Sequence, residues 1–267
     1  MANRPGYDQI AEGDWTYLGK QLARLKGSGR STKGRKQVLS LNQLVSGIPL
    51  FGGTARKVGR ALKLGQKPFP GSPAYWEERY ATGGDSGVGS YGKFAEFKAE
   101  VINSFVAQNR IESVIEFGCG DGNQLALANY PSYMGFDVSR SAVERCQNRF
   151  SSDPTKSFYL LDEYIKQAAD MALSLDVIFH LVEDDVFESY MHRLFGAATR
   201  FVIIYSSDTN ENSDVGIAHV RHRKFSAWIR ENVSGWELKQ HIPNRYPYDG
   251  DYRQSSFADF YIYAKTE

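Results

Sequence analysis

The feature that most constrains the fold is the segment Glu116-Phe-Gly118-Cys-Gly120-Asp-Gly122, which directly follows a short apolar run at 113–117. Three glycines at alternate positions let the backbone approach a ligand at distances where any Cβ would clash. An apolar strand followed by such a turn is typical of ligand sites at the carboxyl end of the first strand of an α/β sheet. A turn that serves packing alone is the competing interpretation.

The spacing of these glycines argues against a dinucleotide site. A dinucleotide fingerprint has glycine at the first, third and sixth positions, whereas here Asn123 stands sixth and Gly122 fifth. Nineteen residues after Gly118, Asp137 ends the next apolar run, where a carboxylate can accept hydrogen bonds from both hydroxyls of a ribose. The pattern therefore predicts an adenosine ligand with an amino-acid tail rather than a pyrophosphate.

Strand-like and helix-like segments alternate around this turn. We expect strands at 113–117, 133–136, 158–161, 171–175 and 201–205, with helices around 94–106, starting at 123–128, and at 141–150, 183–198 and 224–231. Such βα units predict a Rossmann-like, doubly wound α/β fold with a mostly parallel sheet and helices on both faces. Strands at 236–242 and 257–264 have no helix between them, so an antiparallel C-terminal pair should complete a seven-stranded sheet.

From about residue 75 to 264 the chain resembles the class I (Rossmann-like) S-adenosylmethionine-dependent methyltransferases, in particular bacterial small-molecule and sugar O-methyltransferases. Their motif is an acid and then Gly-x-Gly-x-Gly after the first strand. The resemblance implies S-adenosyl-L-methionine as cofactor, lined by Gly118, Gly120 and Gly122, with Glu116 beneath it. It further implies Asp137 on the ribose and Asp162 near the adenine amino group. YWEERY resembles an aromatic entry segment of such enzymes, which implies the following residues near the methionine end: Tyr75, Trp76, Arg79 and Tyr80.

Candidate catalytic residues follow the fourth and fifth strands, on the edge where open α/β sheets bind ligands. An alcohol acceptor must lose its proton as the methyl bond forms, so His180 is the first candidate base and His219 or His222 the second. Asp176 could orient a histidine or hold an acceptor hydroxyl; alternatively, Asp176 and Asp208 could hold a divalent cation, although no metal is the main expectation.

Further along, the loop 244–252 combines flat rings with hydrogen-bond donors, a composition suited to a polar acceptor. With Asp208, it supplies the candidate acceptor-binding residues Arg245 and Tyr246. The same loop could equally be a hairpin connection packed by its tyrosines. Five glycines between 83 and 92 predict an irregular segment, interpreted as a lid that excludes water.

The amino-terminal part differs in charge from the rest. Residues 1–70 hold thirteen Lys or Arg and three acids, a net charge of +10, although the whole chain carries +1. We expect a partly ordered basic arm over 1–74, with a short helix around 37–46, and a cofactor-binding domain over 75–267. Residues 20–70 could contact nucleic acid or an anionic membrane surface.

Three functional hypotheses follow. The first is an O-methyltransferase for a sugar, glycan or related polar acceptor. The second is an RNA methyltransferase whose basic arm grips phosphates. The third is a non-catalytic module tethered to a membrane surface or a partner. The chain has only two cysteines, and it contains neither an apolar signal-peptide core nor a run of about 18 apolar residues. These features favour a cytoplasmic setting, with attachment to a membrane surface as the alternative.

Overall fold

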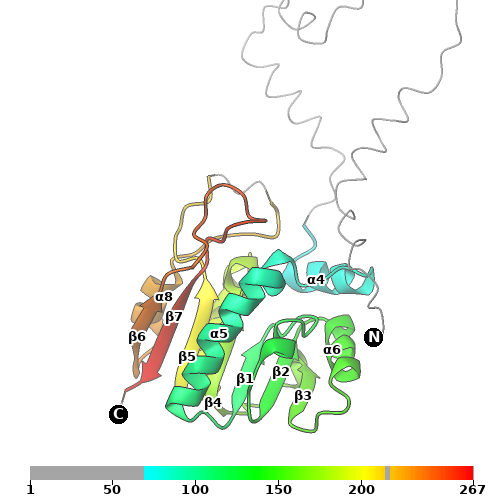
Figure 1. Ribbon diagram of the computed structural model, residues 1–267. Coiled ribbons are helices and arrows are strands. Elements are labelled where there is room, and N and C mark those ends of the chain that lie inside the picture. Colours follow the sequence, from blue (N-terminus) through cyan, green and yellow to red (C-terminus); the bar gives the residue numbers. More distant parts are fainter. Residues whose placement is uncertain (1–68, 214–216, 267) are drawn as a thin grey trace, which may run out of the picture. The chain divides into compact units, whose positions relative to one another are not determined.

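A seven-stranded sheet organises the part of the chain that the computed structural model describes, residues 69–213 and 217–266. The strand order is β3-β2-β1-β4-β5-β7-β6 (Figure 1). The parallel strands are β1 (Val114–Phe117), β2 (Tyr133–Asp137), β3 (Lys156–Leu160), β4 (Ala169–Leu175) and β5 (Ala198–Ser206). β7 (Asp259–Lys265) lies antiparallel between β5 and β6 (Trp236–Ile242). The predicted mixed sheet with an antiparallel C-terminal pair is therefore confirmed.

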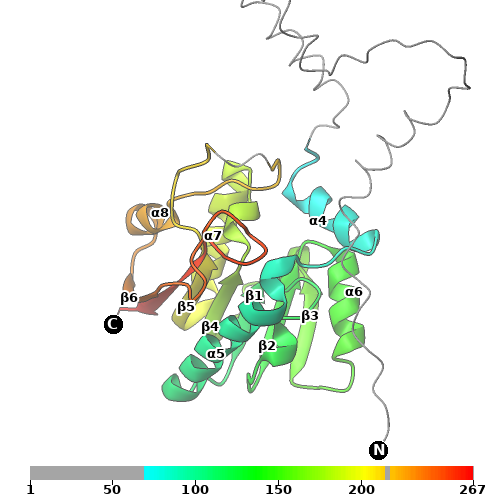
Figure 2. The same ribbon diagram turned by 45° about the horizontal axis from the view of Figure 1, so that its top comes forward.

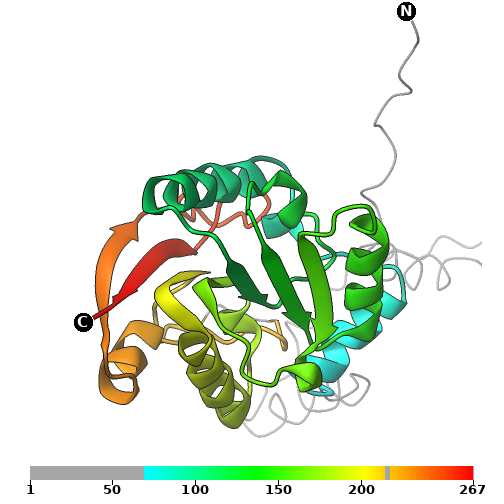
Figure 3. The same ribbon diagram turned by 90° about the horizontal axis from the view of Figure 1, so that it is seen from below.

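Helices cover both faces of the sheet, as Figure 3 shows from below. On one face, α5 (Gly92–Asn109) and α6 (Arg140–Arg149) bury residues such as Phe105 and Val143 against β1, β3 and β5. On the other, α7 (Asp184–Gly196) and α8 (Phe225–Asn232) bury residues such as Met191 and Ile229. Apolar residues three and four positions apart form one stripe on each helix, and burial of each large apolar side chain contributes about 1.5–3 kcal/mol.

The sheet reverses its direction of growth between β1 and β4. β1 pairs with β2 on one side, with Phe117 opposite Phe136, and with β4 on the other, with Glu116 opposite Leu173. The carboxyl ends of these three strands consequently lie side by side. Open α/β sheets bind ligands in the crevice beyond such a switch point.

The prediction of a helix starting at 123–128 was wrong. Only one 3-10 turn, Leu125–Leu127, follows the glycine motif, and the chain is extended again at Ala128. Pro131 shortly precedes β2 and disfavours a helical conformation of the residue before it. From Ala128 the chain therefore returns to β2 without a further helical turn.

Two segments before β1 lie over the carboxyl ends of the strands. α4 (Ser72–Ala81) is next to α6 (Figure 2), where the Glu77 carboxylate accepts hydrogen bonds from Ser139 and Ser141 hydroxyls at 2.7 Å. The glycine-rich segment 83–92 is largely irregular, with one 3-10 turn at Val88–Ser90. The predicted helix at 37–46 lies outside the described residues. The basic segment 20–70 also lies outside them, apart from its last two residues, Phe69 and Pro70.

Candidate functional site

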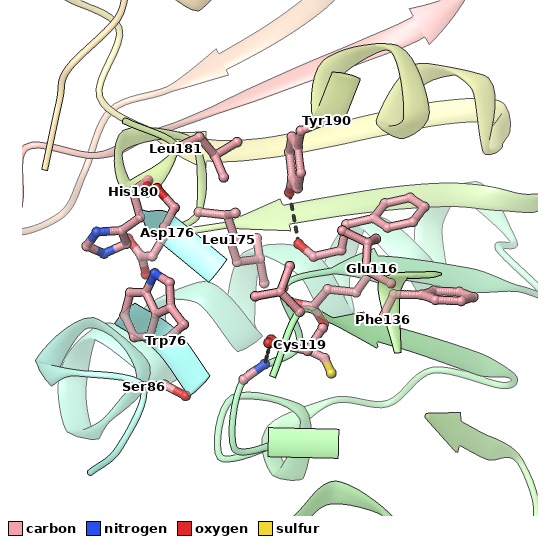
Figure 4. A pocket seen from close by; sticks show the side chains of 18 of the residues that line it. Trp76, Ser86, Glu116, Cys119, Phe136, Leu175, Asp176, His180, Leu181 and Tyr190 are labelled. Atoms are coloured by element: carbon pink, nitrogen blue, oxygen red, sulfur yellow. Dashed lines mark hydrogen bonds between the residues drawn. The ribbon is translucent and has the colours of Figure 1, made fainter. Parts of the chain in front are cut away.

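A pocket lies at the carboxyl ends of β1, β2 and β4 and encloses about 940 Å³, part of it open to solvent. Figure 4 shows Trp76, Asp176 and His180 grouped at one end and Phe136 and Tyr190 toward the other. The pocket lining includes many of the predicted residues: Trp76, Tyr80, Glu116, Gly118, Gly120, Asp137, Asp176 and His180. The glycine motif therefore lies at the carboxyl end of the first strand, as its sequence predicts, and the other residues of this set share the same pocket.

The glycine turn passes through the pocket wall in left-handed backbone conformations. A Cβ on Gly118, whose φ is 89°, would lie 2.5 Å from Val177 Cγ2. A Cβ on Gly120 would lie 2.4 Å from the Ser86 hydroxyl oxygen. Gly122 does not line the pocket, because its missing side chain would point at Phe150 and Cys146. Gly118 and Gly120 therefore line the pocket, whereas the lack of a side chain at Gly122 leaves room for Cys146 of α6 and for Phe150.

Two buried carboxylates line the pocket beside this turn. Asp137 accepts backbone hydrogen bonds at 2.9 Å from Gly120 and Ser139, one on each oxygen, and burial raises its pKa to about 6. Glu116 accepts a 2.6 Å hydrogen bond from the Tyr133 hydroxyl, and burial raises its pKa to about 7. A carboxylate has about four lone-pair sites, so Asp137 can still accept a hydrogen bond from a ligand.

The segment 83–92 is fastened to the glycine turn through the Asp121 carboxylate. Asp121 accepts hydrogen bonds from the Ser86 backbone N–H at 2.9 Å and from the Tyr91 hydroxyl at 2.7 Å. The Ser86 hydroxyl oxygen accepts a 3.0 Å hydrogen bond from the Asp121 N–H and lies 2.9 Å from the Tyr80 hydroxyl. These contacts hold Tyr80 and Ser86 in the pocket wall.

The other two residues of the entry helix make different contacts. Arg79 pairs with the Asp85 carboxylate at 3.0 Å and does not line the pocket. Tyr75 also lies outside the lining, with its ring stacked on His219 at a centroid distance of 4.3 Å. Tyr75 contacts the Trp76 ring edge-on at 5.4 Å, and the Arg79 guanidinium lies 5.8 Å from the same ring, so both residues support Trp76 without lining the pocket.

His180 is oriented by a backbone carbonyl. Its Nδ1 lies 2.9 Å from the His219 carbonyl oxygen, which can only accept, so Nδ1 carries the proton and Nε2 has the lone pair. Burial lowers the pKa of His180 to about 3. Its ring contacts Trp76 edge-on at 4.8 Å and lies parallel to that of His219 at 5.4 Å. His180 is therefore a neutral imidazole at the pocket end formed by α4.

Asp176 is paired with a residue that the sequence did not single out. The Lys98 ammonium, on a side chain that is 0% exposed, donates to Asp176 Oδ2 at 2.5 Å. Lys98 lines the pocket and lies 5.2 Å from the Tyr205 ring centroid. A signal did exist, because Lys98 falls between Phe94 and Ile102 on the apolar stripe of α5, where a charge is rarely placed without a partner.

His222 and Asp208 lie outside the pocket lining. His222 is buried, its Nδ1 is 2.6 Å from the Ser207 hydroxyl, and burial lowers its pKa. Asp208 accepts from the backbone N–H and hydroxyl of Ser226 in the first turn of α8, at 2.9 and 2.6 Å. Within residues 69–213 and 217–266, no group of three His, Cys, Asp or Glu side chains is arranged to hold a metal.

The remaining predicted residues also lie away from the pocket. Arg245 forms a two-point ion pair with Glu100, at 2.9 and 2.8 Å, and Tyr246 packs edge-on against Phe94 at 5.7 Å. Arg245 and Tyr246 therefore pack on α5, whereas Tyr248 and Tyr252 of the same loop are exposed. Asp162 is exposed just after β3, where its neighbour Leu161 lines the pocket. In the described part of the chain, no helix has the length and apolar character of a membrane span.

Comparisons with known proteins find similarity in structure but not in sequence. No protein-family model matches the chain, and no curated protein matches its sequence. N-methyltransferase NodS from Bradyrhizobium japonicum WM9 superimposes with a TM-score of 0.58 at 12% identity, covering 73% of this chain and 99% of that chain. Magnesium protoporphyrin IX methyltransferase ChlM from Synechocystis PCC 6803 gives 0.53 at 13% identity, covering 75% and 100%. The methyltransferase domain of bacterial CtHen1 gives 0.50 at 18% identity, covering 64% and 97%. At these identities the likeness shows a shared fold.

Proposed function

We propose that this chain, which has the class I methyltransferase fold, is an S-adenosylmethionine-dependent methyltransferase. One observation carries the proposal: the pocket at the switch point of the sheet joins a close-approach glycine turn to the buried Asp137 carboxylate. NodS and ChlM, which share the fold, were crystallised with S-adenosyl-L-homocysteine and S-adenosylmethionine respectively.

The pocket lining fits this cofactor along its length. Asp137 has acceptor capacity left for the ribose hydroxyls, and the apolar residues Phe136 and Leu161 line the same pocket for the adenine. Trp76 and Tyr80 present aromatic rings, which attract a cation such as a sulfonium.

We further propose O-methylation of a polar, hydroxylated acceptor such as a sugar or glycan. When bound, S-adenosylmethionine supplies an electrophilic methyl group, and the protein mainly aligns the partners for in-line displacement. His180 Nε2 is the unprotonated nitrogen at the pocket end lined by Trp76, so it can accept a hydrogen bond from an acceptor hydroxyl. Because its pKa is about 3, His180 takes the proton only as the methyl bond forms and the acceptor oxygen becomes strongly acidic. The Trp76 ring suits the apolar face of a sugar ring.

Two measurements test these proposals separately. Calorimetry with S-adenosyl-L-homocysteine should detect binding that Asp137→Ala abolishes, and absence of binding to the wild-type chain would contradict a methyltransferase. Transfer of a labelled methyl group to a set of monosaccharides, glycans and sugar nucleotides should then identify an acceptor. Transfer to amines, with none to any hydroxyl, would contradict O-methylation while leaving methyl transfer intact.

An RNA acceptor is the second candidate, and the observation that favours it is the +10 charge of residues 1–70. Binding through those charges should weaken steeply with salt, since each neutralised phosphate releases counterions. Salt-dependent RNA binding that disappears on deletion of residues 1–68 would support it. Deletion-sensitive binding to anionic lipid vesicles, without cofactor binding, would instead support the non-catalytic tether.

A further inference from the structure

The turn 178–182, which follows β4 and carries His180 (Figure 4), is held at four consecutive backbone carbonyls, those of 179–182. In the order of these carbonyls, the donors are the Arg221 backbone N–H at 2.8 Å, the Ser72 hydroxyl at 2.7 Å, and the Arg223 guanidinium at 3.2 and 2.8 Å. A surface loop can leave such carbonyls to water. Here donors from distant parts of the chain hold the backbone on which His180 stands.

Arg223 is the more enclosed of the two arginines that reach this turn. Its side chain is 11% exposed, against 42% for Arg221, which adds one side-chain hydrogen bond to the last carbonyl at 2.9 Å. The Arg223 guanidinium also donates to Asp184 at 2.6 Å and lies 4.8 Å from the centre of the Phe187 ring. Because a guanidinium is a rigid planar fork of donors, these contacts together determine where Arg223 lies relative to the turn.

The segment 217–223, which ends at Arg223, also supplies the carbonyl that orients the His180 ring. His180 Nδ1 lies 2.9 Å from the His219 carbonyl oxygen. A neutral imidazole has one nitrogen that donates and one that accepts, and the partner of one nitrogen decides which is which. If the segment moved away from the turn, His180 would lose this acceptor and its proton could shift to Nε2. A ring with its proton on Nε2 offers no lone pair to an acceptor hydroxyl.

We infer that Arg223 is a positioning residue for the base. It holds the segment 217–223 against the turn 178–182, so that His180 keeps its proton on Nδ1 and presents the Nε2 lone pair to the acceptor. Arg223 does not line the pocket, so it acts through His180 and not on the ligand. This inference rests on the proposed function, in which His180 is the base.

The test reads the tautomer of His180 directly. Two-bond ¹H–¹⁵N NMR spectra of the full chain, labelled with ¹⁵N-histidine, show which ring nitrogen carries the proton, and His180→Gln identifies the His180 signals. At pH 7 the wild type should have its proton on Nδ1. Arg223→Met, which loses every donor, should place part or all of the proton on Nε2. Arg223→Lys keeps the charge but not the planar fork, so it should fall between the two.

Turnover then separates positioning from a role in stability alone. With the acceptor found by labelled methyl transfer, Arg223→Met should lower kcat by about tenfold or more, which is part of the roughly 10²–10⁴ that a positioned base contributes. Affinity for S-adenosyl-L-homocysteine should not change. Lys224→Met is the matched control, because Lys224 is the next residue, is exposed, and lies 3.8 Å from Asp208. It should change neither the tautomer nor kcat.

Thermal unfolding of each variant checks the fold. If Arg223→Met unfolds, Arg221→Met takes its place and should shift the tautomer in the same direction by a smaller amount. A wild type with its proton on Nε2, an unchanged tautomer in the variant, or a shifted tautomer with unchanged kcat overturns the role of Arg223 and leaves the proposed function intact. A wild-type chain that does not bind S-adenosyl-L-homocysteine overturns the proposed function, and the role of Arg223 with it.

Discussion

Cofactor affinity should depend on pH through Asp137. Burial raises the pKa of this carboxyl to about 6 in the ligand-free protein. If ribose hydroxyls donate to the carboxylate, only the ionised form binds well. At pH 5 about one-tenth of the protein has this group ionised, against about nine-tenths at pH 7, so affinity for S-adenosyl-L-homocysteine should fall roughly tenfold between these values.

The raised pKa of Asp137 also affects the stability of the protein, but with the opposite pH dependence to that of cofactor affinity. A carboxyl whose pKa rises from about 3.9 when unfolded to about 6 when folded stabilises the native state below pH 4, and this contribution of about 3 kcal/mol is lost as pH rises through 6. A ligand that binds the ionised form offsets the loss. The increase in melting temperature caused by S-adenosyl-L-homocysteine should therefore be larger at pH 7 than at pH 5.

Calorimetry at half-unit steps from pH 5 to 7.5 measures the affinity, with Asp137→Asn and Glu116→Gln as comparisons. Asp137→Asn should lose the pH dependence and weaken binding by roughly tenfold or more, since one acceptor oxygen is replaced by an NH2 donor and the remaining hydrogen bond is no longer to a charged group. Glu116→Gln removes the other buried acid of the pocket lining, whose pKa is about 7, and the affinity of this variant should retain a midpoint near pH 6. A flat wild-type profile, or an Asp137→Asn profile like that of the wild type, would refute the reasoning.

Three further substitutions probe other parts of the site. His180→Gln should lower kcat for a hydroxylated acceptor by about 10²–10⁴ without changing the affinity for S-adenosyl-L-homocysteine; an unchanged kcat would exclude His180 as the base. Gly118→Ala should destabilise the protein to urea by about 1–3 kcal/mol, because φ is 89° and the new Cβ meets Val177; wild-type stability would contradict this strain. Arg245→Ala should leave both the stability to urea and the acceptor turnover nearly unchanged, since its pair with Glu100 is exposed to solvent; a loss of acceptor turnover would contradict this and support a role for Arg245 in acceptor binding.

The features that could be predicted from sequence are those encoded within short stretches. The strands were recognised because buried parallel strands are short apolar runs. The glycine turn and Asp137 belong to one strand-turn-strand unit, so their separation in sequence determines their separation in space. The positions of Asp176 and His180 could be predicted for a similar reason. Both lie in the segment that follows β4, and the carboxyl ends of parallel strands share one edge of the sheet.

The roles of residues farther along the chain were harder to predict, because the type of a residue does not reveal which distant side chain or backbone group it contacts. Asp208 follows β5 as Asp176 follows β4, yet Asp208 accepts hydrogen bonds from Ser226 at the start of α8. Arg245 and Tyr246 have the composition of a sugar-binding loop, but they contact Glu100 and Phe94 on α5. In each case a contact between distant segments satisfies the group that the sequence left available.

Lys98 shows how such contacts could be anticipated. A lysine on the apolar stripe of a helix must either reach water along its stem or meet a carboxylate, because an unpaired buried ammonium is far too costly. Phe94, Phe97 and Ile102 surround it on α5, so the stripe itself predicts burial. An acid at the end of a neighbouring central strand is then the natural partner, which Asp176 is. A charge that breaks the apolar period of a helix packed against a ligand-binding sheet therefore points to the ligand pocket, even when no motif includes it.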